Sequence, residues 1–122
     1  METREIRRGE LYWLVADDEG GSIPPIAHPH LVLQEDVFNR SRLPTVIVCA
    51  LTTNLRRASE PGNVLLGEGE GDLPRRSVVV VSQLTAAPRA RFDRRIGALT
   101  QARVDQVLAG LRLQQASFFG GR

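Results

Sequence analysis

The chain of 122 residues contains one cysteine, no lysine and no long apolar run. With Cys49 alone it cannot form an intramolecular disulfide, and the apolar run around it predicts a buried thiol in a reducing compartment. No apolar run approaches the ~20 residues of a membrane-spanning helix, and residues 1–10 lack the apolar core of a signal peptide. These absences predict a soluble, cytoplasmic protein of one domain without a membrane partner.

All 16 basic residues are arginines, and they are unevenly distributed. Residues 1–74 carry seven arginines against twelve acidic residues, whereas residues 75–122 carry nine against two. Arginine forms bidentate contacts with phosphate and stacks on bases, and clustered positive charge is typical of nucleic-acid binding. A lysine-free composition also reflects codon bias, which explains the choice of arginine but not its clustering.

Short β-strand patterns separated by turn residues dominate the chain. The predicted strands are residues 9–15, 30–34, 45–52, 63–66 and 77–85, with Pro29 tolerated because it stands at the start of its strand. Residues 17–27 are predicted to form an exposed loop, residues 35–41 one helical turn, and residues 67–72 a hairpin loop. Several strands with one terminal helix indicate a mainly β protein, a small β-barrel with a helix packed on it.

The predicted C-terminal helix begins after Thr100, which is a suitable N-cap residue. Apolar residues recur at helical spacing on one face, at Val104, Val107, Leu108 and Leu111. Gly110 is expected to weaken this helix a little.

The sequence offers candidates for three kinds of chemistry. His28 and His30 are two apart on one predicted strand face, but a zinc site needs three or four converging ligands. GEGEGD (67–72) matches neither a calcium loop nor a phosphate-binding loop, and no serine stands in a nucleophile-elbow motif. A histidine at the mouth of a barrel, near the TTN that ends a central strand at 52–54, leaves acid–base chemistry and simple strand termination both open.

Several blocks stand in the order and spacing of one known family: RRGELYWL, GS at 21–22, HPHLVLQEDVFNRS, PTVIVCALTTN, PGNVLL, LPRRSVVVVSQLT and RRIGALTQARVDQVLAGL. Together they resemble the MazF/PemK family of small toxins of bacterial toxin–antitoxin modules. The resemblance implies an SH3-like β-barrel with one or two helices, in one domain over 1–122 with a core at about 7–116 and a frayed tail at 117–122.

The resemblance also implies metal-independent cleavage of single-stranded RNA without a cofactor. In that reaction the ribose 2′-hydroxyl attacks the adjacent phosphate, which requires a base, support for the phosphorane and an acid. Thr52 falls on the family's threonine at the end of the third strand, and His28 falls on its arginine. The expected substrate-binding residues are Gly21, Ser22, Thr53, Asn54 and Gln83.

The chain departs from the family pattern at three places around this expected site. His28 replaces the arginine, exchanging a fixed charge and a bidentate fork for a titratable group. Gly-Ser-Glu-Gln has become Gly21-Ser22-Ile23-Pro24, and Gln-Ile-Arg-Thr has become Gln83-Leu84-Thr85-Ala86. His30 falls on a usually apolar position and is interpreted as a bystander.

These departures leave two alternatives to an active nuclease: a toxin of the same fold that binds DNA gyrase, and a degraded homologue that only binds its antitoxin. The resemblance implies a homodimer and an antitoxin whose acidic segment lies over the active-site groove. Six arginines of the basic half are predicted to meet RNA or that segment: Arg75, Arg76, Arg89, Arg91, Arg94 and Arg95.

Overall fold

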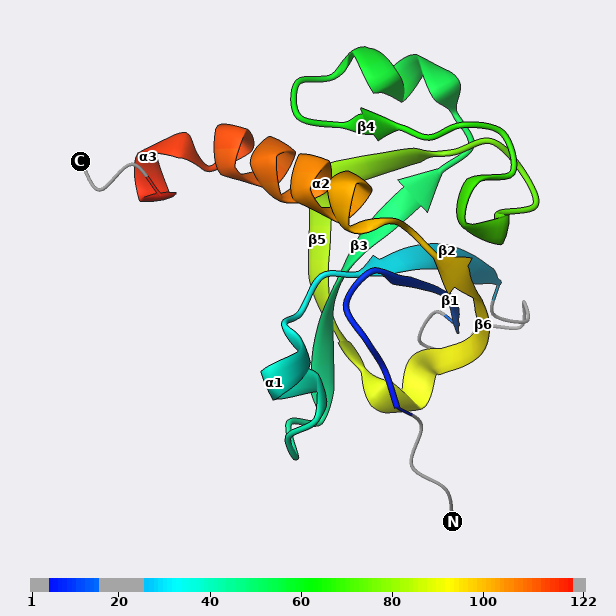
Figure 1. Ribbon diagram of the computed structural model, residues 1–122, viewed down its shortest axis with the longest axis vertical. Coiled ribbons are helices and arrows are strands. Elements are labelled where there is room, and N and C mark those ends of the chain that lie inside the picture. The colour runs from blue at the N-terminus through cyan, green and yellow to red at the C-terminus, as the bar shows by residue number, and fades with distance from the viewer. Residues whose placement is uncertain (1–4, 16–25, 120–122) are drawn as a thin grey trace.

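A curved antiparallel sheet of six strands forms the body of the protein (Figure 1). The computed structural model describes residues 5–15 and 26–119. The strand order is β4-β5-β3-β2-β1-β6. The strands are β1 (Glu10–Val15), β2 (Ala27–Val32), β3 (Thr45–Thr52), β4 (Val64–Leu65), β5 (Val78–Pro88) and β6 (Phe92–Ala98). The end strands β4 and β6 are not paired with each other in the described sheet, so the barrel-like curve is not closed by hydrogen bonds.

The helical elements are short except for one. They are α1 (Asp36–Asn39), α2 (Gln101–Gln114) and α3 (Ala116–Phe119), with 3-10 turns η1 (Leu55–Ser59), η2 (Glu70–Asp72) and η3 (Arg89–Arg91). No helix of the described residues is long and apolar enough to cross a membrane. The predicted fold class, mainly β with a C-terminal helix packed on a small barrel-like sheet, is confirmed.

Both faces of the sheet are covered, because apolar side chains alternate along the central strands. One face carries Leu11, Leu31 and Cys49, which pack with Val104 and Val107 of α2. The opposite face lies inside the curve of the sheet and carries a second cluster, Ile6, Tyr12, Leu14, Val32, Val46, Val48, Ala87 and Phe92. The Cys49 thiol is fully buried, as predicted, and burial raises its pKa to about 12.

Helix α2 begins as the sequence predicts. The Thr100 hydroxyl accepts a hydrogen bond from the backbone N–H of Arg103, 3.3 Å away, and Val104 and Val107 are buried. Gly110 is also buried and faces the turn at Gly62, whose carbonyl oxygen lies 2.0 Å from the position a Cβ would take. Gly110 therefore allows the helix to approach this backbone closely.

Strand β5 bends in the middle and takes part in both cores. Cys49 pairs with Leu84, whereas Leu51 pairs with Val79, so β5 contains three more residues than β3 between these pairs. Such a bulge bends a strand and exchanges the face on which its side chains lie. The bend is held at Val81, whose N–H donates to Oδ1 of Asn63 at 3.1 Å.

Three strand predictions need correction. Strand β2 begins at Ala27, inside the segment predicted as loop, so Pro29 stands in the middle of the strand. Strand β5 continues to Pro88, beyond the predicted end at residue 85. Strand β6 was not predicted, because the charged run at residues 93–95 interrupts the alternation and the β1–β6 register shifts around Tyr12.

Candidate active site

Strands β2 and β3 separate at one end, and Pro29 explains why. The N–H of Leu33 donates to the carbonyl of Ile47, which shows that odd-numbered residues of β2 direct their backbone groups toward β3. Pro29 is an odd-numbered residue, so its backbone nitrogen faces β3, but proline has no N–H to donate there. The β2–β3 pairing accordingly ends at His30 opposite Ala50.

His28 and Thr52 stand on either side of this opening. Each lies two residues beyond the last pair, His30–Ala50, so the alternation of side chains directs both to the same face of their strands. His28 is exposed and Thr52 half-buried. The two residues predicted to be catalytic thus follow the last pair of two neighbouring strands, His28 on β2 and Thr52 on β3.

The Thr52 hydroxyl has a defined orientation and a free donor. Its Oγ1 accepts a hydrogen bond from the backbone N–H of Asn54 at 3.1 Å. Because a hydroxyl has one proton and two lone pairs, this bond fixes the oxygen and leaves the proton available to a ligand. The Asn54 side chain stabilises the local fold: its Oδ1 accepts a hydrogen bond from the backbone N–H of Arg56 and so caps the N-terminus of η1.

His28 lies between two depressions in the surface. One, of about 250 Å³, is lined by His28 and His30 together with Thr85 and Arg91. The other, of about 130 Å³, is lined by His28, Thr53, Trp13 and Arg75 among others. An arginine therefore stands at each side of the histidine that replaces the expected arginine.

The two histidines differ in their surroundings. His30 is half-buried, and its Nδ1 lies 3.0 Å from the main-chain oxygen of His28. A carbonyl oxygen only accepts, so Nδ1 carries the proton in this contact. Burial lowers the pKa of His30, although the hydrogen bond to His28 opposes that effect. The His30 ring is thus directed by the fold, whereas the exposed His28 ring has no hydrogen bond within the described residues.

The remaining predicted site residues are placed unevenly. Thr53 lines the smaller depression with His28. Gln83 is exposed in the bend of β5 and lines neither depression. Gly21 and Ser22 lie outside the described residues. Trp13 and Thr85 were missed, because only the pairing of β1, β2 and β3 with β5 brings them beside His28.

The arginines predicted to meet RNA fall into two groups. Arg76, Arg89 and Arg95 already bind groups of the protein, respectively the Leu66 carbonyl, three carbonyls of the α1–β3 region, and the Glu10 carboxylate at 2.8 Å. Arg75 and Arg91 line the depressions at His28, where Arg91 also interacts with another group of the protein, and Arg94 is exposed on β6.

The arrangement suits proton transfer beside an anionic group. An exposed imidazole can take up or release a proton, an oriented hydroxyl can donate to a phosphoryl oxygen, and flanking guanidinium groups favour negative charge. Within residues 5–15 and 26–119, no three His, Cys, Asp or Glu side chains gather in a way that could hold a metal ion.

Comparison with known proteins gives a consistent result. Residues 7–114 match the family model described as PemK-like, MazF-like toxin of type II toxin-antitoxin system. The chain is 38% identical over 107 residues to "Endoribonuclease MazF6" of Mycobacterium tuberculosis, covering 88% of this chain and 94% of that protein. It is 28% identical to "Endoribonuclease EndoA" of Bacillus subtilis, covering 91% of this chain and 95% of that protein.

Solved structures share the fold. A MazE-MazF structure from Deinococcus radiodurans superposes with a TM-score of 0.78 at 19% identity, covering 93% of this chain and 98% of that chain. A mycobacterial endoribonuclease in complex with its cognate antitoxin superposes with a TM-score of 0.70 at 19% identity, covering 93% and 96%.

Proposed function

The chain belongs to the PemK-like, MazF-like toxins of type II toxin–antitoxin systems, and from this premise we propose that it is an endoribonuclease toxin. It cleaves single-stranded RNA without a metal ion, by attack of a ribose 2′-hydroxyl on the adjacent phosphate. The observation that supports the proposal most is that His28 and Thr52 lie on neighbouring strands, each two residues beyond the last β2–β3 pair.

Proton transfer, hydrogen bonding to the phosphate and charge neutralisation each have a candidate group. His28 transfers the proton, taking it from the 2′-hydroxyl or giving it to the leaving 5′ oxygen. Thr52 donates its free hydroxyl proton to a phosphoryl oxygen, since Asn54 already occupies one of its lone pairs. Arg75, exposed in the depression that His28 also lines, supplies the positive charge that the arginine-to-histidine replacement removed.

The proposed substrate-binding residues are those around this opening, Gly21, Ser22, Thr53, Asn54 and Gln83. Thr53 shares the smaller depression with the flat, half-buried side chain of Trp13, which suits stacking of a base. The proposed partners are an antitoxin with an acidic segment and a second copy of the chain, and the proposed location is the cytoplasm. The curated relatives are named endoribonucleases, which favours RNA cleavage over gyrase binding.

The decisive experiment is sequencing of RNA ends after incubation with the purified chain in EDTA. We expect cleavage at a defined motif with 2′,3′-cyclic phosphate ends, and a loss of about 10²–10⁴-fold in rate for His28→Ala. Thr52→Ala and Arg75→Ala should also cleave slowly. Full activity of His28→Ala, with unchanged thermal stability, would remove His28 from the mechanism.

Two variants separate the roles of the histidines. His28→Arg restores the residue that the family carries at this position, so this variant should still cleave RNA. His30→Gln is the matched control in the same depression and should retain the cleavage motif and the pH profile. Inhibition of gyrase supercoiling by a chain that leaves RNA intact would contradict the proposed function.

A further inference from the structure

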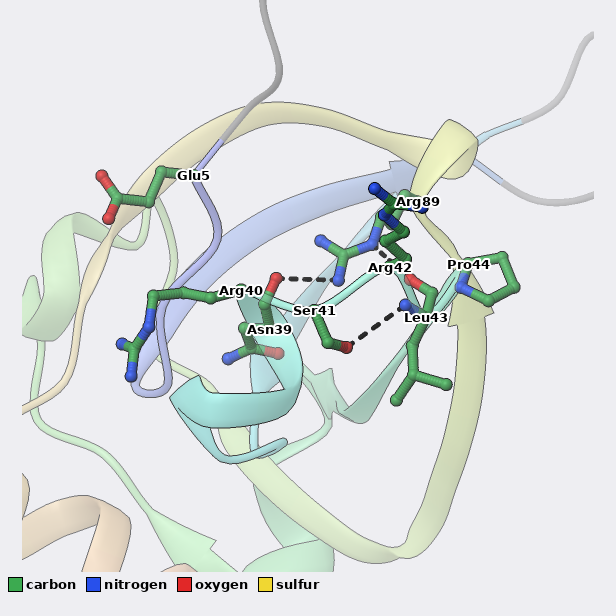
Figure 2. A pocket seen from close by; sticks show the side chains of 8 residues that line it. All are labelled: Glu5, Asn39, Arg40, Ser41, Arg42, Leu43, Pro44 and Arg89. Carbon is green, nitrogen blue, oxygen red and sulfur yellow. Dashed lines mark hydrogen bonds between the residues drawn. The ribbon is translucent and has the colours of Figure 1, made fainter.

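A second concave surface lies between α1 and β3, apart from the residues that line the depressions at His28 (Figure 2). It has a volume of about 480 Å³ and is lined by residues 39–44, Arg89 and Glu5. We call it the arginine hollow, because Arg40, Arg42 and Arg89 all line it. Two of these three belong to the half of the chain that is acidic overall, so the charge distribution along the sequence does not indicate it.

The loop that forms the hollow is held in one conformation. Arg89 donates from Nε to the carbonyl of Leu43 at 2.7 Å and from Nη2 to the carbonyl of Asn39 at 2.8 Å. The Ser41 hydroxyl donates to the carbonyl of Phe38 at 2.6 Å and accepts from the N–H of Leu43. A rigid loop lowers the entropic cost of binding a ligand.

Positive charge in the hollow is incompletely compensated. Among the described residues, Arg89 donates its hydrogen bonds to carbonyl oxygens and none to a carboxylate. Arg42 is exposed, and its guanidinium has no partner within the described residues. The one acidic lining residue, Glu5, forms an ion pair with Arg7 at 3.2 Å. Figure 2 shows Arg40 extended on the side of the loop away from Arg42 and Arg89, and all three arginines line the hollow.

Arg40 contributes less than the other two arginines. It lies near enough to Asp36 to help lower the pKa of that carboxyl group, although the main cause is the hydrogen bond from the backbone of Arg8. Its charge is thus partly balanced. Arg42 and Arg89 remain as the pair suited to an anion.

The hollow and the His28 site share one structural element. Arg89 and Arg91 are the first and last residues of η3, and Arg91 lines the larger depression beside His28. The same short turn therefore supplies an arginine to each concave surface. A chain-like ligand that carries negative charges at regular intervals could contact the arginine hollow and the larger depression at His28 at the same time, one on each side of η3.

We propose that the arginine hollow binds a phosphodiester group of the RNA substrate away from the cleaved bond. Arg42 and Arg89 hold the phosphate, and the contact adds affinity for long RNA without taking part in catalysis. This inference rests on the proposed function for the identity of the ligand. It is tested by binding alone, so that its failure is distinguishable from absence of cleavage.

The experiment measures fluorescence anisotropy with 2′-O-methyl RNA, which cannot be cleaved by 2′-hydroxyl attack. One probe of about 20 nucleotides exceeds the roughly 4–16 nucleotides that a single-strand binding surface covers, and a second probe has about 4. Arg42→Ala is compared with wild type, with Arg42→Lys, and with Arg112→Ala, which removes the same charge from exposed helix α2. Thermal unfolding verifies that each variant is folded.

We expect Arg42→Ala to weaken binding of the long probe about three- to tenfold and to leave the short probe unchanged. The slope of log affinity against log salt should fall by about 0.7, so that the loss of affinity between 50 and 200 mM salt becomes roughly 2.6-fold smaller. Arg42→Lys should keep the slope, because its charge remains. Arg112→Ala should behave as wild type.

Three results would overturn the inference. The first is an unchanged slope for Arg42→Ala with the long probe. The second is an equal loss of affinity for the long and the short probe in Arg42→Ala, which would place Arg42 at the cleaved bond. The third is unchanged RNA binding together with weaker binding of a polyglutamate peptide, which would assign the hollow to an acidic protein segment.

Discussion

Replacing Gly110 with alanine should destabilise the protein, although alanine is the better helix former. Gly110 lies within α2, and in the interior of a helix alanine is more favourable than glycine by about 1 kcal/mol of folding free energy. An ideal Cβ at this position would lie 2.0 Å from the carbonyl oxygen of Gly62 and 2.8 Å from its carbonyl carbon. Ordinary contacts begin near 3.4 Å, so helix and turn would have to separate by about 1.4 Å.

The magnitude follows from what must move. The obstructing atoms belong to the backbone of Gly62 and not to the far end of a flexible side chain, so they cannot turn aside without moving the chain. Separation would also loosen the contact between α2 and the sheet, where Val107 is fully buried. Overpacking of this kind costs about 1–3 kcal/mol or more, and a rigid obstacle favours the upper end. The higher helix preference of alanine offsets about 1 kcal/mol of this cost. We therefore expect Gly110→Ala to lower the free energy of unfolding by about 2 kcal/mol.

Urea unfolding at one fixed protein concentration measures this difference. With a slope typical of small domains, the midpoint should fall by about 1 M. Ala109→Gly, at the exposed neighbouring position, measures helix preference in the same helix and should cost about 1 kcal/mol. Gly67→Ala, where a Cβ would meet only an ordinary contact at 3.4 Å, controls for the substitution itself. If Gly110→Ala unfolds at a higher urea concentration than wild type, the close-contact argument is refuted.

Three further predictions concern stability and reactivity. Asn63→Ala should cost about 1–3 kcal/mol in urea unfolding because it leaves the N–H of Val81 without its acceptor and the carbonyl of Arg57 without its donor. Asn63→Asp should not restore stability, because it keeps an acceptor for Val81 but sets a carboxylate oxygen against the Arg57 carbonyl and the Glu60 carboxylate. Hydrogen bonding from Arg103 lowers the pKa of Glu70 below its ordinary value of 4.5. The Glu70–Arg103 pair therefore stabilises the fold above pH 4.5, and this stabilisation is lost as the pH falls through the pKa that Glu70 has in the folded protein. Glu70→Gln should therefore be about 0.5–1 kcal/mol less stable at pH 7 and equal to wild type in acid, and equal loss at both pH values would exclude the ion pair as cause. Because burial raises the pKa of Cys49 to about 12, its thiol should react with a disulfide reagent at pH 8 only as fast as the protein opens, and a stoichiometric reaction within seconds would contradict that burial.

The cap of α2 and its buried face were predictable because they depend on neighbouring residues. Thr100, Val104 and Val107 stand at the spacing that one helix requires. Strand β1 was equally clear, since its alternation is uninterrupted. Strand β6 was not, because its charged centre is acceptable only beside β1, where Arg95 pairs with Glu10.

The site was predictable only in part. Resemblance to a family selected His28 and Thr52, and the structure places them on neighbouring strands, each two residues beyond the last β2–β3 pair. The positions of Gly21 and Ser22 lie outside the described residues. Arg75 and Arg91 were named for RNA binding, but nothing local to them shows that they flank His28. The arginine hollow went unpredicted because Arg42 and Arg89 are distant in the chain.

The sequence by itself determined the β-rich character and the terminal helix, since each depends on residue type and short-range spacing, and its resemblance to a family predicted a catalytic position at His28. The tertiary structure alone decided what surrounds that position. Pro29 ends the pairing of β2 with β3 because its alternation would direct an N–H toward β3, and the bend of β5 turns Thr85 toward His28. Strand register and close backbone contacts such as Gly62–Gly110 arise only when distant segments pack, and for that reason no local pattern encodes them.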